Sequence, residues 1–202
     1  MQKKYLTEVY GLRDPQSTKA FYDDWAGSYE AELAENRYAT PARVAAALTE
    51  TQTPLDARIL DYGCGTGLSG EAFVAAGYTL IDGTDLSPEM LAEAEAKQIY
   101  GRLFLTEPGA TLSVVEGSYD VIAAVGVVGP GAAPVALLQT FCGLLAPGGR
   151  LAFSYNDHAL GDAEACAARD ALDAPMRRLH DSYGDHLPGI GLNSAVYVYE
   201  KT

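Results

Sequence analysis

The sequence has few cysteines and no long apolar run. Its three cysteines, Cys64, Cys142 and Cys166, form no CxxC pair, so neither a disulfide framework nor a metal-ligand spacing is present. No stretch approaches the roughly 18 apolar residues that a membrane span needs. The first residues also lack the apolar core of a secretory signal. We therefore expect a cytoplasmic protein with no membrane partner and no metal.

Basic residues are also scarce. The 202 residues include 14 Lys and Arg against 27 Asp and Glu, which gives a formal net charge of -13. Such a surface repels phosphate backbones, so this charge predicts that no nucleic acid is a partner. The length fits one domain, and apolar residues make up 48% of the chain, which is enough to form a core.

Apolar strands alternate with helices over the centre of the chain. Short apolar runs predict strands over 59–62, 78–84, 102–106, 119–125 and 150–155, and periodic segments predict helices over 68–76, 89–99 and 134–145. This alternation implies parallel βαβ units with right-handed crossovers, and hence an α/β fold.

The two ends of the chain are expected to complete this core. Helices are predicted over 16–36, 40–49 and 163–179, and a final strand over 195–199 could pair antiparallel at the end of the sheet. Thr40 is expected to cap the second of these helices, with Pro41 at its first position.

A glycine-rich loop follows the first predicted strand. Gly63, Gly65 and Gly67 lie between that strand and a helix, where glycine permits a tight turn and lets a ligand approach the backbone. In open α/β sheets, ligands bind beyond the carboxyl ends of the strands. We therefore expect a cofactor site here rather than a simple turn.

Two cofactors fit part of this pattern. Residues 65–70 satisfy the dinucleotide fingerprint GxGxxG, and Asp85 lies twenty positions after Gly65, where an acidic residue binds ribose hydroxyls of NAD or S-adenosylmethionine alike. Asp61, just before the loop, separates the two. A carboxylate there would be badly placed near a pyrophosphate but well placed near the ammonium of a methionine moiety.

Three segments resemble motifs of class I methyltransferases, in the same order and spacing. LDYGCGTG at 60–67 is similar to their motif I, DGTDLSPEML at 82–91 to the motif after their second strand, and LLAPGGRL at 144–151 to the turn before their fifth strand. The resemblance covers about residues 20 to 155. YDDWAGSY at 22–29, with Tyr38 and Pro41, is similar to small-molecule methyltransferases of the Williams–Beuren region protein 27-like group.

The resemblance implies a Rossmann-like, doubly wound and mostly parallel seven-stranded sheet with an N-terminal helical cap. The chain would form a single domain over 1–202, with the cap at 1–50, the cofactor-binding core at 55–155 and the completion of the sheet at 156–202. The implied cofactor is S-adenosylmethionine.

Site residues are also implied by the matching positions. Asp61 and the backbone of the glycine loop would hold the methionine part, Asp85 would bind the ribose hydroxyls, and Leu86 would pack on the adenine. Near the adenine amino group the usual aspartate is absent. Trp25 and Tyr29 would cover the cofactor, although they also suit the apolar face of an amphipathic helix. The implied cofactor-binding set is Trp25, Tyr29, Asp61, Gly63, Cys64, Gly65, Gly67, Asp85, Leu86, Met90, Thr106, Glu107, Gly126 and Val127.

The expected activity is methyl transfer to a small molecule. The protein would chiefly align donor and nucleophile and exclude water. His158, after the fifth strand, is a candidate general base, although it also suits a surface position beside a helix cap. The fourth strand is followed by GVVGP at 126–130 instead of the Asn/Asp-Pro-Pro-aromatic motif of enzymes that methylate exocyclic amines of nucleic acids.

Two alternatives remain open at this point. An NAD(P)-dependent oxidoreductase would use the same GxGxxG fingerprint. A catalytically inactive S-adenosylmethionine-binding protein would keep the site but turn over no acceptor. The sequence leaves the acceptor and the oligomeric state undetermined.

Overall fold

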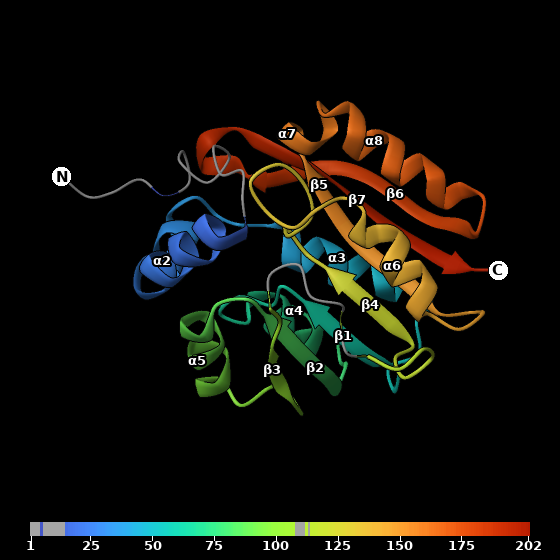
Figure 1. The fold of residues 1–202 in the computed structure, drawn as a ribbon, viewed down its shortest axis with the longest axis horizontal. Coiled ribbons are helices and arrows are strands. Elements are labelled where there is room, and N and C mark those ends of the chain that lie inside the picture. Colours follow the sequence, from blue (N-terminus) through green and yellow to red (C-terminus); the bar gives the residue numbers. More distant parts are fainter. Residues whose placement is uncertain (1–4, 6–14, 108–111, 113) are drawn as a thin grey trace.

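The computed structural model describes residues 5, 15–107, 112 and 114–202 (Figure 1). Its centre is a seven-stranded sheet with the strand order β3-β2-β1-β4-β5-β7-β6. The strands are β1 (Arg58–Tyr62), β2 (Leu80–Asp85), β3 (Leu103–Leu105), β4 (Val121–Ala124), β5 (Arg150–Asn156), β6 (Met176–Leu187) and β7 (Leu192–Lys201). Strands β1 to β5 pair in parallel, whereas β7 pairs antiparallel with both β5 and β6. The predicted fold class is therefore confirmed, and the final strand is antiparallel as expected, but it lies between β5 and β6 instead of at the end of the sheet.

Helices cover both faces of this sheet. They are α2 (Pro15–Glu35), α3 (Thr40–Glu50), α4 (Leu68–Ala75), α5 (Pro88–Ala96), α6 (Leu137–Leu144), α7 (Asp157–Leu160) and α8 (Ala163–Asp170), with short 3-10 turns at Ala171–Asp173 and Pro188–Ile190. Because successive strand residues point to opposite faces, the sheet forms two cores. Leu60, Ile122 and Phe153 face α6 and α8, while neighbouring strand residues face α3 and α4.

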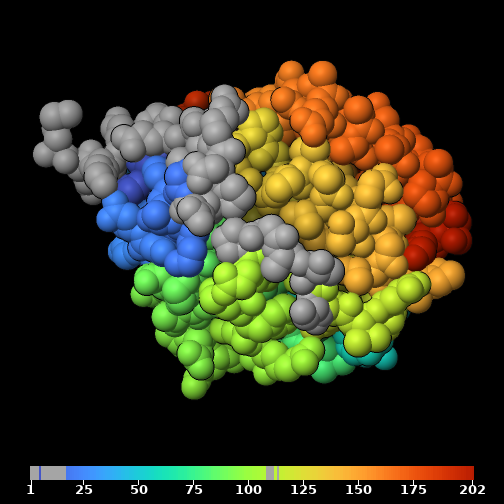
Figure 2. All heavy atoms as spheres, viewed as in Figure 1, coloured from blue at the N-terminus to red at the C-terminus, as the bar shows by residue number. Residues whose placement is uncertain are grey.

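The sheet reverses its winding between β1 and β4. From β1 the chain moves outward through β2 to β3, and it then returns to place β4 on the other side of β1. Ligands of open α/β proteins bind at such a switch point, beyond the carboxyl ends of the strands. Helix α2 lies beside α5 at this end of the molecule, as the blue and green surfaces of Figure 2 show.

The C-terminal part differs from the prediction. The predicted helix over 163–179 ends at Asp170, and residues 176–187 form strand β6, which the sequence did not reveal. This edge strand pairs only with β7, and its central residues alternate poorly between apolar and polar. Its conformation therefore depends on backbone pairing with a distant segment, which no local pattern records.

The start of α3 also differs in detail. Ala39, not Thr40, is the N-cap residue, and Pro41 fits the first turn as expected. The Thr40 side chain instead contacts His186 and Ser194. Residues 1–4 and 6–14 of the predicted helical cap lie outside the described residues. In the described part of the chain, the helices lack the combination of length and apolar character that crossing a bilayer requires.

Candidate functional site

The glycine loop lies at the carboxyl ends of β1 and β2. The amides of Gly63 and Cys64 both donate to the Thr84 carbonyl, at 2.7 and 3.0 Å, which ties the loop to β2. Gly63 has a positive φ of 66°, and a Cβ there would collide with Val127. Gly65 has a φ of 54°, but no atom lies within 4 Å of where its Cβ would be. The loop is thus packed at Gly63 and open at Gly65, where a ligand could approach the backbone.

Asp61 is fully buried behind this loop. Its Oδ2 accepts hydrogen bonds from Ser69 Oγ at 2.7 Å and from Tyr100 OH at 2.8 Å. Its Oδ1 is also buried but has no hydrogen-bond partner among the described residues. Burial raises the pKa of the Asp61 carboxyl to about 6. A buried oxygen without a partner is costly, so Oδ1 is suited to a donor supplied by a ligand.

Asp85 ends β2 and joins two loops. Its Oδ2 accepts from the Gly65 amide and its Oδ1 from the Ser87 amide, each at 2.9 Å. Burial raises the pKa of the Asp85 carboxyl, and the charge of Asp85 in turn contributes to the raised pKa of Asp61. Two carboxylates therefore flank the loop, and their field opposes a pyrophosphate and favours a cationic or hydroxyl-bearing ligand.

Two hollows meet beside this loop. The first, called here the glycine-loop hollow, is lined by loop residues together with Ser69, Val125, Tyr29 and Tyr38. The second, called here the aromatic pocket, is lined by α2, the segment after β4, and the ends of β5 and β6. Tyr29 and Tyr38 line both hollows, so these two rings form the boundary between them.

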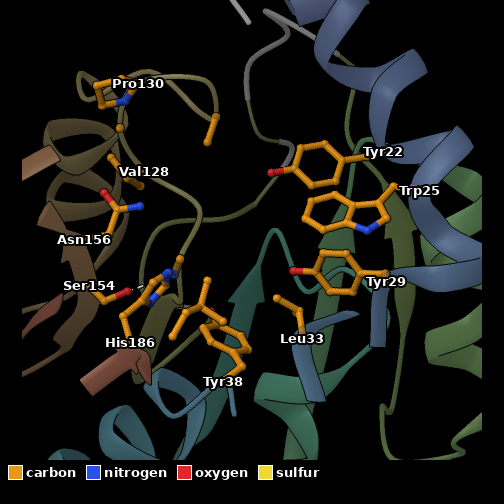
Figure 3. Close-up of a pocket in the computed structure, with 14 residues that line it drawn as sticks. Tyr22, Trp25, Tyr29, Leu33, Tyr38, Val128, Pro130, Ser154, Asn156 and His186 are labelled. Atoms are coloured by element: carbon orange, nitrogen blue, oxygen red, sulfur yellow. Dashed lines mark hydrogen bonds between the residues drawn. The ribbon is translucent and has the colours of Figure 1, made fainter. Parts of the chain in front are cut away.

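One wall of the aromatic pocket comes from α2 (Figure 3). Tyr22, Trp25 and Tyr29 project from this helix toward the opposite wall. The rings of Tyr22 and Trp25 stack with their centroids 5.9 Å apart, and Tyr29 meets Trp25 edge-on at 4.7 Å. Trp25 is buried and its Nε1 donates to Glu32 at 3.0 Å. The aromatic stripe of α2 therefore packs internally and also lines the pocket.

The opposite wall carries Ser154, Asn156 and His186 (Figure 3). Ser154 Oγ accepts a hydrogen bond from the Gly126 amide at 2.9 Å, and Asn156 Oδ1 accepts one from the amide of Ala159 at 3.1 Å. The imidazole Nδ1 of His186 lies 2.7 Å from Thr40 Oγ1. Burial lowers the pKa of His186 to about 4, so its ring is neutral at neutral pH.

The predicted cofactor residues fall into three groups. Tyr29, Gly63, Cys64 and Gly65 line the glycine-loop hollow, and Trp25, Tyr29 and Gly126 line the aromatic pocket. Asp61, Asp85 and Val127 lie directly behind the loop or in contact with it. The remaining predicted residues line neither hollow: Gly67, Leu86, Met90, Thr106 and Glu107.

The outer residues have distinct surroundings. Met90 is buried in α5, and Gly67 has a positive φ of 96° at the start of α4. The Thr106 amide donates to the Asp85 carbonyl at 2.8 Å, and its hydroxyl contacts that of Thr84. Glu107 is exposed. The structure thus places Thr106 beside Asp85, while Glu107 points to solvent.

The histidine nearest the site is not the one that the sequence suggested. His158 is exposed on α7 and is absent from the pocket lining, although its charge is near enough to lower the pKa of His186. Its catalytic role stays a prediction. His186 was not predicted because it lies on β6, the strand that the sequence did not reveal. Tyr38 could have been found from the sequence, because it was named with the N-terminal segment that resembles small-molecule methyltransferases.

Comparisons with known proteins identify related sequences. A sequence profile described as a methyltransferase domain matches residues 33–189. Human methyltransferase-like protein 27 is 31% identical over 177 residues, which cover 86% of this chain and 70% of that protein. The Saccharomyces cerevisiae 18S rRNA (guanine(1575)-N(7))-methyltransferase is 37% identical over 70 residues, 35% of this chain and 26% of the relative.

A solved structure agrees in fold. The magnesium protoporphyrin IX methyltransferase of Synechocystis, with bound S-adenosylhomocysteine, has a TM-score of 0.65 at 17% identity and covers 92% of this chain and 100% of its own. At this identity the likeness concerns the fold alone.

These relatives correct one prediction. The expectation that no nucleic acid is a partner is wrong as an inference from charge, because several matching proteins are 18S rRNA methyltransferases. A net charge averages over the whole surface, whereas a nucleic acid contacts only part of it. The missing motif after the fourth strand is also uninformative here, because guanine N7 is a ring nitrogen and not an exocyclic amine.

Proposed function

Because the chain belongs to the class I S-adenosylmethionine-dependent methyltransferases, we propose that it methylates a small organic acceptor bound in the aromatic pocket. The chain is an enzyme of this class, and its cofactor is S-adenosylmethionine. The ambiguity of the GxGxxG fingerprint is therefore resolved against NAD(P). The acceptor class is our proposal, and it rests on the two adjoining hollows.

The residues around the glycine loop fit this cofactor. Oδ1 of Asp61, which has no hydrogen-bond partner among the described residues, suits the ammonium of the methionine part. The open space at Gly65 would let the methionine part lie against the backbone of the loop. Asp85 would accept from the ribose hydroxyls, with Leu86 and Met90 toward the adenine. Gly126 and Val127 would lie near the sulfonium, with Trp25 and Tyr29 covering it. Each carboxylate thus meets a donor or a cation.

When bound, the cofactor would supply a methyl group on a positive sulfonium, with a neutral thioether as leaving group, and the methylated acceptor would take the positive charge or release a proton. The chain's own residues hold the acceptor and exclude water. Tyr29 and Tyr38 lie where the two hollows meet, so they would border the line of transfer. Orientation of this kind can supply roughly 7–11 kcal/mol of the barrier.

The lining of the aromatic pocket supports a small acceptor. Among the described residues that line it there is no Lys, Arg, Asp or Glu, and its walls come from α2, the segment after β4 and the ends of β5 and β6. A small, uncharged ligand would suit the space between the rings on one side and Ser154, Asn156 and His186 on the other. We further propose that the three segments 1–50, 55–155 and 156–202 act as one domain, because the Ala39 amide donates to the His186 carbonyl at 2.9 Å.

The proposed function has a two-part test. First, a thermal-shift series with S-adenosylmethionine, S-adenosylhomocysteine, NAD and NADP measures which ligand binds the native state. We expect a higher melting temperature with the first two only. Second, methyl-labelled S-adenosylmethionine is incubated with the protein and either a small-molecule extract or purified ribosomal RNA.

Label in the small-molecule fraction supports the proposal, and label in the RNA replaces it with the activity that the rRNA relatives' names describe. Binding of S-adenosylhomocysteine without label in either fraction is the result that the catalytically inactive binding protein predicts. His158→Gln belongs in the same assay, since a loss of turnover without a loss of cofactor binding is what a general base at His158 requires.

A further inference from the structure

The imidazole of His186 lies at the end of a buried chain of polar side chains. Its Nδ1 is 2.7 Å from Thr40 Oγ1, which is 3.0 Å from Ser194 Oγ. Ser194 Oγ in turn accepts from Arg43 at 2.9 Å. Thr40 and Ser194 are both fully buried. This series of hydrogen bonds therefore connects the guanidinium of Arg43 to His186 in the lining of the aromatic pocket.

The direction of each hydrogen bond follows from the Arg43 donor and from giving each buried hydroxyl hydrogen an acceptor. A guanidinium can only donate, so Ser194 Oγ must accept from it. Ser194 Oγ has a second lone pair, but if it also accepted from Thr40 its own buried hydrogen would have no acceptor, so we assign that hydrogen to Thr40 Oγ1. Because Thr40 Oγ1 accepts from Ser194, its own hydrogen is directed to His186 Nδ1. Nδ1 is thus an acceptor, and the ring proton resides on Nε2.

The protonated nitrogen is the one that Thr40 leaves available to a ligand. His186 lines the aromatic pocket, and its Nε2 has no hydrogen-bond partner among the described residues. Tyr38 packs edge-on against the ring at 5.2 Å and limits its rotation. Burial, together with the charges of Arg43 and His158, lowers the pKa of His186, and Asp157 opposes this effect. The ring is therefore a neutral donor and has no lone pair to offer the pocket.

Asn156 on the same wall has its polarity fixed in the same way. Its Oδ1 accepts from the Ala159 amide, which can only donate, so the oxygen end of this side chain is held at α7. The polar groups of this wall are therefore oriented by hydrogen bonds to residues behind it, and the described lining residues carry no formal charge.

We propose that His186 is a fixed Nε2–H donor that selects acceptors carrying an uncharged accepting oxygen on a planar body. This inference rests on the proposed function of the aromatic pocket as the acceptor site. The aromatic rings of α2 pack on the planar body, and the imidazole donates to a carbonyl, ether or hydroxyl oxygen. His186 then does not remove a proton from the acceptor, and Thr40, Ser194 and Arg43 are positioning residues that keep its tautomer.

The tautomer itself is the first test. Two-bond ¹H–¹⁵N correlation spectra of the ¹⁵N-labelled full chain distinguish Nε2–H, Nδ1–H and imidazolium rings, and His186→Gln assigns the signal. We expect Nε2–H between pH 6 and 8, and a mixture of tautomers in Thr40→Val and in Ser194→Ala. An Nδ1–H ring or an imidazolium at pH 7 in the unmodified protein overturns the proposal. This readout needs no acceptor and no cofactor, so it is independent of the proposed function.

The second test measures selection with a matched pair of probes. Acetophenone carries an accepting carbonyl, and ethylbenzene has a similar ring without one. Their affinities are compared by ligand-observed NMR in the presence of saturating S-adenosylhomocysteine. One hydrogen bond predicts that acetophenone binds about 3- to 10-fold more tightly. We expect His186→Phe to remove this preference and His186→Gln, which keeps an amide donor, to retain part of it.

His180→Gln is the matched control, because His180 lies on the same strand and its Nε2 contacts Ser182 at 2.8 Å, outside the pocket lining. This variant should keep the full preference. Equal binding of both probes to the unmodified protein, or an unchanged preference in His186→Phe, overturns the proposal. Failure of S-adenosylhomocysteine to bind in the thermal-shift series contradicts the proposed function instead, so the two failures are distinguishable.

Discussion

The glycine-loop hollow and the aromatic pocket share two tyrosines but are built in different ways. The first takes its key groups from Asp61 to Ser69 and from Asp85, within one βαβ unit. The second joins α2, near the beginning of the chain, to β5 and β6, near its end. Their electrostatics are also opposite. Burial raises the pKa of two carboxyls beside the first and lowers the pKa of an imidazole in the second. The glycine-loop hollow is thus built from one local unit, while the proposed acceptor pocket depends on segments that are distant in the sequence.

Gly65→Val should have the largest effect on cofactor binding at the glycine-loop hollow. Its positive φ is unfavourable for valine, and the added side chain fills the open space in front of the backbone. We expect the affinity for S-adenosylhomocysteine, measured by calorimetry, to fall more than about 100-fold. Gly148→Val is the matched control, because Gly148 also has a positive φ with no atom near its Cβ position but lies in the turn before β5. An equal loss of binding in both variants would assign the effect to backbone strain alone.

Asp85→Ala should have the next largest effect. The variant removes a carboxylate that accepts from Gly65 and Ser87 and that we assign to the ribose hydroxyls. Loss of charge-assisted hydrogen bonds predicts about 30- to 100-fold weaker binding, or about 2–3 kcal/mol. Asp82→Ala is the control on the same strand, since its carboxylate binds Arg102 and Tyr119 instead. Unchanged calorimetric affinity in Asp85→Ala would contradict the ribose assignment.

The opposite pKa shifts predict opposite pH dependences of stability. The folded pKa of His186 is about 4 against 6.5 unfolded, so the unfolded state binds more protons and stability falls as the pH drops from 6.5. The folded pKa of Asp61 is about 6 against 3.8 unfolded, so the folded state binds more protons here. The contribution of Asp61 to the stability of the protein therefore increases as the pH drops through 6. Each contribution is at most about 2 kcal/mol between pH 6.5 and 5.

Urea unfolding of two variants separates these terms. Relative to the unmodified protein, His186→Gln should lose less stability on acidification and Asp61→Asn should lose more. Parallel curves of unfolding free energy against pH for all three proteins would show that neither group titrates in this range.

The smallest effect concerns the helix that borders both hollows. Lys97 Nζ lies 2.6 Å from Glu30 on α2 and 2.6 Å from Glu71 on α4, and it is only partly exposed. Lys97→Met should lower the unfolding free energy by about 1 kcal/mol or less and change cofactor affinity by only a few-fold. Arg177→Met, which removes an exposed pair with Glu200, is the control. A loss of binding as large as that in Asp85→Ala would mean that this ion pair holds α2 in its binding position.

The same contrast explains what could be predicted from the sequence. The strands around the glycine loop, the winding of the sheet and the positions of Asp61 and Asp85 follow local patterns of apolar runs, glycines and carboxylates. Strand β6 and His186 do not, because an edge strand held by backbone pairing and by Arg43 has little apolar alternation. The hydroxyl of Thr40 suggested a helix cap, but its partner on β6 is 146 positions away. Side chains whose partners are that distant are invisible to a local pattern.

The hydrogen bonds between Arg43 and the hairpin of β6 and β7 have a consequence for the order of events during translation. Its guanidinium donates to the carbonyls of Ser182, Asp185 and Ser194. These contacts of α3 can form only after strands about 140 residues later have been synthesised. During translation, β1, β2 and the glycine loop between them are synthesised well before β6 and β7. The loop that we assign to the methyl donor is therefore synthesised before a segment that the proposed acceptor wall requires.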